Sequence, residues 1–235
     1  ADKSVNAAER RADWWLFGGI YRPVYLTAKP RTQIEHIAVD ARADGTLHTD
    51  VYLKNISKGQ QLELSLISCD SQLPIGRQVC GLSTEEKQIL TTHWNNIRTW
   101  DPEHPNLYRL TMRLLSTTGD VVHEITERIG FRTIEFRPED GVYLNGTRLL
   151  VKGINRHCFD PETGRTISRE LSLKDALLIK QMNMNAVRSH YPPDTHFLEA
   201  CDSIGLLYLN ELCGWQNSYS TEICLLYTSP SPRDA

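Results

Sequence analysis

Three short apolar runs, each ending in polar residues, constrain the fold of this chain more than any other feature. They lie in LLVKGIN (Leu149–Asn155), AVRSHYPP (Ala186–Pro193) and LLYLNE (Leu206–Glu211), and segments with helical periodicity separate them. Strand, helix, strand, helix, strand is the order of a parallel sheet with crossover helices. Each run is apolar on both faces, as in a sheet that helices cover. The sequence therefore predicts an α/β arrangement here.

The two segments between these runs carry helix signals. The first helix is predicted to begin at Ser172 as its N-cap, with Asp175 at the capping-box spacing. The second is predicted to begin at Asp194 and to end at Gly205, because glycine readily adopts the left-handed conformation that ends helices. The predicted buried stripes comprise Leu173, Ala176 and Leu177 in the first helix, and Phe197, Ala200, Cys201 and Ile204 in the second.

Polar side chains follow each predicted strand at its carboxyl end, which is where parallel sheets gather their ligands. A sheet end with only a packing role would carry aliphatic residues instead. The candidates are Asn155, Arg156 and His157, then Arg188, His190 and Tyr191, then Asn210 and Glu211. We therefore predict a ligand site along this edge.

The same residues carry a family resemblance. VKGINRH, NAVRSHYPP and GLLYLNE resemble, in order and separation, the first three barrel strands of glycoside hydrolase family 2, which contains multidomain β-galactosidases and β-glucuronidases. The resemblance implies the first three β/α units of a TIM barrel over residues 136–223. It also implies a retaining mechanism with two carboxylates about 5–5.5 Å apart.

Short alternating segments precede this region. Leu47, Thr49, Val51 and Leu53 share one face of a predicted strand; Leu62, Leu64 and Leu66 share a face of another, and Tyr108, Leu110, Met112 and Leu114 a face of a third. Such strands, separated by turn signals, predict an immunoglobulin-like β-sandwich over residues 31–135. WDPEHPNLYRL and GFRTIEF are similar to the end of that sandwich in the family. A hairpin is then predicted in Tyr143–Leu150, with its turn at Asn145–Gly146.

The two ends complete the predicted organisation. Residues 1–30 resemble the end of the N-terminal jelly-roll, sugar-binding domain of the family, with Asp13, Gly19, Ile20, Tyr21 and Arg22 matching its closing segment. Residues 224–235 follow no helix or strand pattern and are interpreted as a non-native tail. We expect the chain to be an internal fragment of a longer enzyme, inactive by itself.

Composition excludes several classes of protein. The formal net charge is −3, which argues against a nucleic-acid partner, and no apolar run is long enough to cross a membrane. Six cysteines form no CxxC pair, which argues against a metal or disulfide framework. The compartment stays open between periplasm and cytoplasm, and the full-length protein is a candidate homo-oligomer.

The resemblance assigns roles residue by residue. It implies that Asp13, His157 and His190 bind sugar hydroxyls and that Arg188 keeps the nucleophile ionised. Supporting roles around them fall to Asn155, Tyr191, Asn210 and Glu211. Asn210–Glu211 mimics the acid/base dipeptide of the family, but it comes after the third strand and not the fourth. Both catalytic glutamates are therefore expected downstream.

One spacing departs from the family. Relatives usually carry one more residue between the arginine and the Ser-His-Tyr-Pro run than VRSHYPP has. The loss of one residue from a strand moves every later side chain of that strand to the opposite face. Either the deletion is therefore a sequencing error, or Arg188 and His190 cannot both point inward.

The leading hypothesis is an exo-acting β-glycosidase that acts on terminal β-linked sugars, first of all β-galactosides. β-Glucuronidase and β-mannosidase of the same family are the alternatives, as is a non-catalytic β-sandwich module that binds carbohydrate or protein. No metal ligand is assigned within this chain, and magnesium or sodium is left open as a cofactor of the full enzyme.

Overall fold

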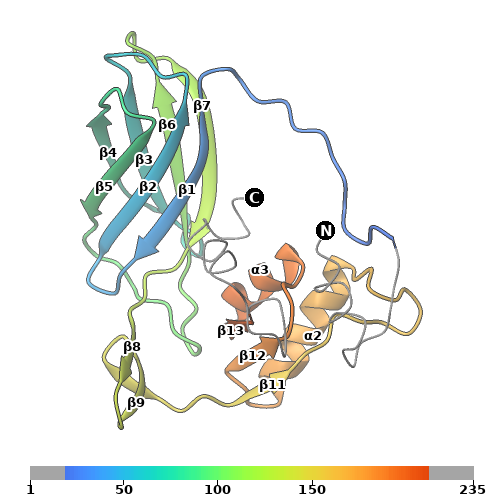
Figure 1. The fold of residues 1–235 in the computed structure, drawn as a ribbon. Coiled ribbons are helices and arrows are strands. Elements are labelled where there is room, and N and C mark those ends of the chain that lie inside the picture. The colour runs from blue at the N-terminus through green and yellow to red at the C-terminus, as the bar shows by residue number, and fades with distance from the viewer. Residues whose placement is uncertain (1–18, 212–235) are drawn as a thin grey trace. The chain divides into compact units, whose positions relative to one another are not determined.

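The computed structural model describes residues 19–211. They form two compact units, one of residues 26–150 and one in which residues 19–25 join residues 151–211. Each unit is considered by itself (Figure 1).

The first unit is built on two antiparallel sheets that pack face to face (Figure 1). One sheet has the order β1-β2-β5, and the other has the order β4-β3-β6-β7. The strands are β1 (Gln33–Ala41), β2 (Thr46–Lys54), β3 (Gln61–Ser68), β4 (Pro74–Gly81), β5 (Lys87–His93), β6 (Tyr108–Leu115) and β7 (Val121–Ile129). This is the predicted immunoglobulin-like sandwich.

Alternation along the central strands supplies its core. Every second residue of β2 from Leu47 to Leu53 is buried, while the residues between them are partly exposed. In β3 and β6 the same alternation buries Leu62, Leu64, Leu66, Leu110, Met112 and Leu114, as predicted. Each such side chain contributes roughly 1.5–3 kcal/mol on removal from water.

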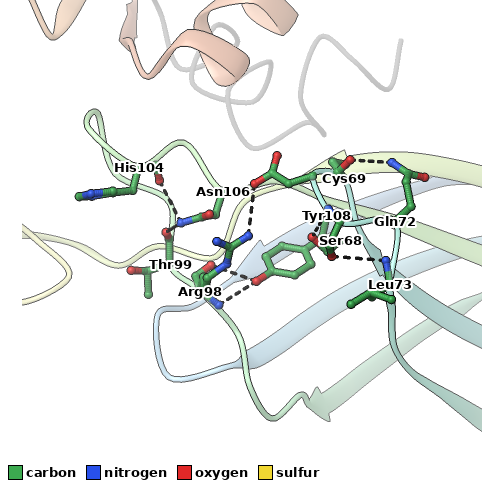
Figure 2. Close-up of polar contacts among 11 residues, drawn as sticks. Ser68, Cys69, Gln72, Leu73, Arg98, Thr99, His104, Asn106 and Tyr108 are labelled. Atoms are coloured by element: carbon green, nitrogen blue, oxygen red, sulfur yellow. Dashed lines mark hydrogen bonds and ion pairs between the residues drawn. The ribbon is translucent and has the colours of Figure 1, made fainter.

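The buried Tyr108 fixes the segment that leads into β6. Its hydroxyl accepts a hydrogen bond from the Arg98 backbone N–H at 2.7 Å and donates to the Arg98 carbonyl at 3.2 Å (Figure 2). The Asn106 side-chain amide donates to the Thr99 carbonyl at 2.9 Å. The ring of Tyr108 meets Phe131 edge to face at 5.4 Å. Tyr108 therefore attaches the long connection between β5 and β6 to the core of the sandwich.

A small sheet of β8 (Ile134–Arg137), β9 (Gly141–Leu144) and β10 (Thr147–Leu149) comes next in the chain, in the order β10-β9-β8. Leu144 pairs with Thr147 across a two-residue turn. Asn145 and Gly146 both have positive φ, 51° and 79°, as a type I′ turn requires. The predicted hairpin is confirmed.

The second unit contains β11 (Gly153–Asn155), β12 (Ala186–Ser189) and β13 (Leu207–Asn210), which pair in parallel in the order β11-β12-β13. Helices α2 (Arg169–Gln181) and α3 (Thr195–Ile204) form the crossovers. The predicted order is confirmed, but the first strand is shorter than expected. It begins only at Gly153, where a Cβ atom would stand 2.9 Å from the Ala186 carbonyl oxygen, so the two strands approach closely because this residue is glycine.

Helix α2 differs from the prediction in its N-cap and in its buried face. Its N-cap is Ser168, whose side chain accepts from the Leu171 N–H, and not Ser172, which is buried inside the helix. Two residues of the predicted stripe are also wrong, because Leu173 and Leu177 are exposed, whereas Ala176 is buried as predicted. The buried face consists instead of Ser172, Ala176 and Ile179, at the i, i+4 and i+7 positions.

Helix α3 agrees closely with the prediction. Asp194 is its N-cap residue, and Gly205 ends it in the left-handed conformation with φ 82°. Its side chains meet α2 and the sheet in a core of Ala176, Ile179, Val187, Phe197, Ala200, Cys201 and Leu206. Burial in this core raises the pKa of the Cys201 thiol to about 12, so Cys201 acts as a packing residue.

Candidate functional site

The alternation of side chains along the parallel strands decides which polar residues meet. Val187 is buried in the core against the helices, so its neighbour Arg188 points to the opposite face of the sheet. Asn155 is paired with Arg188 in register and shares that face. His157 and His190 stand two residues beyond them, and their contacts place them on the same side.

Arg188 connects the ends of all three strands. One terminal nitrogen of its guanidinium, Nη1, donates to Asn155 Oδ1 at 3.0 Å and lies 3.1 Å from His190 Nε2. The other, Nη2, lies 2.6 Å from the Glu211 carboxylate oxygen Oε2. Because a guanidinium only donates hydrogen bonds, Nε2 of His190 is the acceptor. A neutral His190 therefore carries its proton on Nδ1.

The contact between Arg188 and His190 bears on the spacing noted in the sequence. The shorter spacing left open an arrangement in which these two side chains do not both point inward. In the structure they lie on the same side and touch. Residues i and i+2 of an extended strand share a face, which is sufficient to bring them together.

His157 lies beside this group. Its ring stacks on that of His190, with centroids 5.2 Å apart and planes inclined by 15°. Its Nδ1 lies 3.4 Å from the hydroxyl of Tyr191, which accepts a hydrogen bond from the Cys158 N–H at 2.9 Å. Tyr191 thus links His157 to the backbone immediately after β11.

Partial burial lowers the pKa of His157; repulsion from His190, when that ring is protonated, and from the Arg165 and Arg188 guanidinium groups lowers it further. The ordinary pKa of histidine is 6.5, so this ring is neutral at neutral pH. A neutral imidazole donates one hydrogen bond and accepts another, which suits it to a sugar hydroxyl.

Arg156 has a structural role, unlike its neighbour His157. Its side chain is 7% exposed and forms bonds of 2.6 and 2.9 Å to one carboxylate oxygen of Asp175 in α2. Its guanidinium carbon also lies 4.0 Å from the centre of the Phe197 ring. Since it points toward the helices, it is removed from the candidate site.

Asn210 is not brought into the group around Arg188. It is in register with Ser189, whose hydroxyl contacts Tyr208 on the face that carries the helices. Glu211, one residue further, is paired with Arg188. The structure thus gathers Asn155, His157, Arg188, His190, Tyr191 and Glu211, which we call the strand-end cluster.

Asp13 lies outside the described residues. The described segment after it contacts the loops at the strand ends. Arg22 donates from Nη2 to the Pro192 carbonyl at 2.5 Å, and its Nε lies 3.3 Å from an Asp194 carboxylate oxygen. The ring of Tyr21 faces Arg165, a residue that the sequence did not mark because no motif signal surrounds it.

Within residues 19–211 no group of three or more His, Cys, Asp or Glu side chains is arranged to hold a metal ion. The magnesium or sodium of the full enzyme stays a prediction. No helix among these residues is long and apolar enough to span a membrane.

Comparison with known families matches two parts of the chain. Residues 32–132 match the family model described as Glycosyl hydrolases family 2, and residues 136–224 match the one described as Glycosyl hydrolases family 2, TIM barrel domain. The sandwich and the parallel sheet are therefore the immunoglobulin-like domain and the start of the TIM-barrel domain of that family.

Individual relatives point the same way. The chain is 35% identical over 212 residues to β-galactosidase BgaC of Bifidobacterium adolescentis, covering 85% of this chain and 20% of that protein. It is 34% identical over 209 residues to a putative β-glucuronidase of Formosa agariphila, covering 86% and 25%. The apo structure of Bacteroides uniformis β-glucuronidase 3 superposes with a TM-score of 0.72 at 27% identity, over 85% of this chain and 25% of that one. The chain thus spans a fifth to a quarter of the length of these relatives.

Proposed function

Since the chain belongs to glycosyl hydrolase family 2, we propose that the protein containing it is a retaining exo-β-glycosidase that acts on terminal β-linked sugars, first of all β-galactosides. The observation that carries the proposal is the strand-end cluster. It gathers hydrogen-bonding side chains at the carboxyl ends of three parallel barrel strands, where TIM-barrel enzymes bind their substrates.

Within the proposal, His157 and His190 bind sugar hydroxyls. Their rings are stacked, and the tautomer of His190 is set by the arginine that donates to it. Two fixed imidazoles offer donors and acceptors at constant positions, which favours a polyol with defined hydroxyl geometry.

Arg188 has the proposed role of holding the nucleophilic glutamate ionised. A fixed positive charge beside a carboxylate lowers its pKa and keeps it reactive at neutral pH. Arg188 is suited to this because contacts from all three strands fix its guanidinium. The nucleophile and the acid/base glutamate belong to strands beyond the third, so Glu211 is assigned to positioning Arg188.

The charge of the cluster favours a neutral sugar. The positive charge of Arg188 is matched by Glu211 at 2.6 Å, and His157 is neutral at neutral pH. Recognition of a uronic acid would instead use a cation close to the sugar, for which Arg165, in contact with Tyr191 beside the cluster, is the candidate. β-Glucuronidase is retained as the second candidate because a putative β-glucuronidase is about as similar in sequence as the β-galactosidase, and a β-glucuronidase structure superposes with a TM-score of 0.72.

The test uses the longer open reading frame that contains this sequence. Purified protein is assayed with the p-nitrophenyl β-galactoside, β-glucuronide and β-mannoside, and the first sugar released is followed by NMR to read its anomeric form. We expect saturable hydrolysis with kcat/KM highest for the galactoside, and a β-anomer as first product. Preference for the glucuronide would select the second candidate. Absence of turnover on all three would contradict the glycosidase and favour a binding module.

A further inference from the structure

Arg165 lies between two aromatic rings that come from distant parts of the chain. Its guanidinium carbon is 4.5 Å from the centre of the Tyr191 ring and 4.9 Å from the centre of the Tyr21 ring. Both distances are within the range of a cation–π contact. Tyr21 belongs to the segment before the sandwich, whereas Tyr191 comes after strand β12.

The loop that carries Arg165 is closed by its own hydrogen bonds. The backbones of Asp160 and Gly164 are bonded to each other in both directions at 2.8 Å. The Asp160 carboxylate also accepts from the N–H groups of Glu162 and Thr163, each at 3.0 Å. Gly164 has φ +65°, a conformation that glycine tolerates at low cost. Arg165 is therefore held by an ordered turn.

The two rings that Arg165 contacts are connected to different parts of the candidate site. The hydroxyl of Tyr191 lies 3.4 Å from His157 Nδ1 and is fixed by the Cys158 N–H. Tyr21 is adjacent to Arg22, which holds the Pro192 carbonyl and Asp194. Arg165 thus stands where the histidine side of the site and the N-terminal segment meet.

We propose that Arg165 is a positioning residue. By contacting both rings, it holds the Tyr21–Arg22 segment against the strand-end cluster, a contact that we call the clasp, and through Tyr191 it fixes the His157 ring for sugar binding. The role requires a flat cation that can stack on two rings at once, which a guanidinium provides and an ammonium does not. This inference rests on the proposed glycosidase function for its effect on substrate.

The test compares Arg165→Met and Arg165→Lys in the longer protein. The first variant keeps much of the side-chain length and removes the charge, while the second keeps the charge and removes the planar group. Arg132→Met is the matched control, because Arg132 lies 5.0 Å from the centre of the Trp100 ring in the sandwich and has no part in the site. Tyr21→Leu and the double variant with Arg165→Met complete a double-mutant cycle.

Two measurements are made on each variant. Hydrogen–deuterium exchange, read by mass spectrometry, should be faster in the peptide containing Tyr21 for Arg165→Met, intermediate for Arg165→Lys, and unchanged for Arg132→Met. Steady-state kinetics should show KM for the preferred glycoside raised about tenfold by Arg165→Met with a smaller change in kcat, in line with the loss of two cation–π contacts. Adding Tyr21→Leu should raise KM little further.

Unchanged exchange at Tyr21 in Arg165→Met would overturn the clasp, and faster exchange with unchanged KM would overturn the positioning role. Equal effects of Arg132→Met and Arg165→Met on KM would also overturn it, because a general loss of stability would then explain both. If the unaltered protein hydrolyses none of the glycosides, the proposed function fails, while the exchange measurement still decides the clasp.

Discussion

The imidazole rings of His157 and His190 stack with their centroids 5.2 Å apart and their planes inclined by only 15°. The two residues come after neighbouring parallel strands and are 33 positions apart in the sequence. Their stacking places two hydrogen-bonding rings at one edge of the sheet. Arg188 on one side and Tyr191 on the other set the orientation of the pair.

Substitution of His157 by alanine should lower kcat/KM of the longer enzyme by about 100-fold or more, because the proposed hydrogen-bond partner of a substrate hydroxyl is lost. Thermal unfolding should shift little. His48→Ala, in the sandwich, is the control and should leave the kinetics unchanged. A near-normal rate for His157→Ala would remove this residue from the site.

The stability of the chain should fall as the pH drops below about 6.5. Burial lowers the pKa of His157 in the folded state below the ordinary value of 6.5, so the unfolded state binds more protons in that range. Stability therefore rises with pH through this window and becomes constant above it. Urea unfolding between about pH 5 and 7.5 should show that the free energy of unfolding decreases less on acidification in His157→Gln than in the unaltered protein. The same decrease in both would contradict a lowered pKa.

Replacement of Arg188 by glutamine should move the acidic limb of the kcat/KM profile to higher pH, because the nucleophile would lose the charge that keeps it ionised. Arg188→Lys keeps a charge and should give a smaller movement. The measurement is a pH–rate profile with an aryl β-galactoside. A lower kcat/KM at every pH, with no movement of the acidic limb, would mean that Arg188 does not keep the nucleophile ionised and has a structural role alone.

Glu211 can be tested as acid/base catalyst with leaving groups of different basicity. Loss of a general acid slows substrates with poor leaving groups far more than activated ones. We expect Glu211→Gln to slow a dinitrophenyl and an alkyl β-galactoside by similar factors, since Glu211 positions Arg188. Selective loss of the alkyl substrate would instead make Glu211 the acid.

In the sandwich, Tyr108→Phe should lower the free energy of unfolding by about 0.5–1.5 kcal/mol, because it removes the hydrogen bonds between the Tyr108 hydroxyl and the partly buried Arg98 backbone groups. Tyr143→Phe is the control, since the Tyr143 hydroxyl donates to the exposed Asp140 carboxylate. Chemical denaturation measures both. Equal effects would contradict the structural role of Tyr108.

The sequence predicts most of this fold because period-two alternation is strong in its central strands. Leu62, Leu64 and Leu66 are all fully buried, as their spacing indicates. The start of α2 is harder to place because serines stand one helical turn apart at positions 168 and 172. The structure distinguishes them, since Ser168 accepts from the Leu171 N–H while Ser172 is buried inside the helix.

Part of the site is also predictable from strand periodicity. His157 and Arg188 are found at strand ends, and alternation alone explains why Arg156 turns away from them. Arg165 could not be found in this way. Its role depends on the distance between Tyr21 and Tyr191, which are 170 residues apart and meet only in the folded chain.

The most direct test of the sugar-site assignment is a crystal structure of the longer enzyme with a non-hydrolysable β-thiogalactoside bound. We expect sugar hydroxyl oxygens at about 3 Å from imidazole nitrogens of both His157 and His190. A sugar bound elsewhere, with neither histidine within hydrogen-bonding distance, would contradict the account.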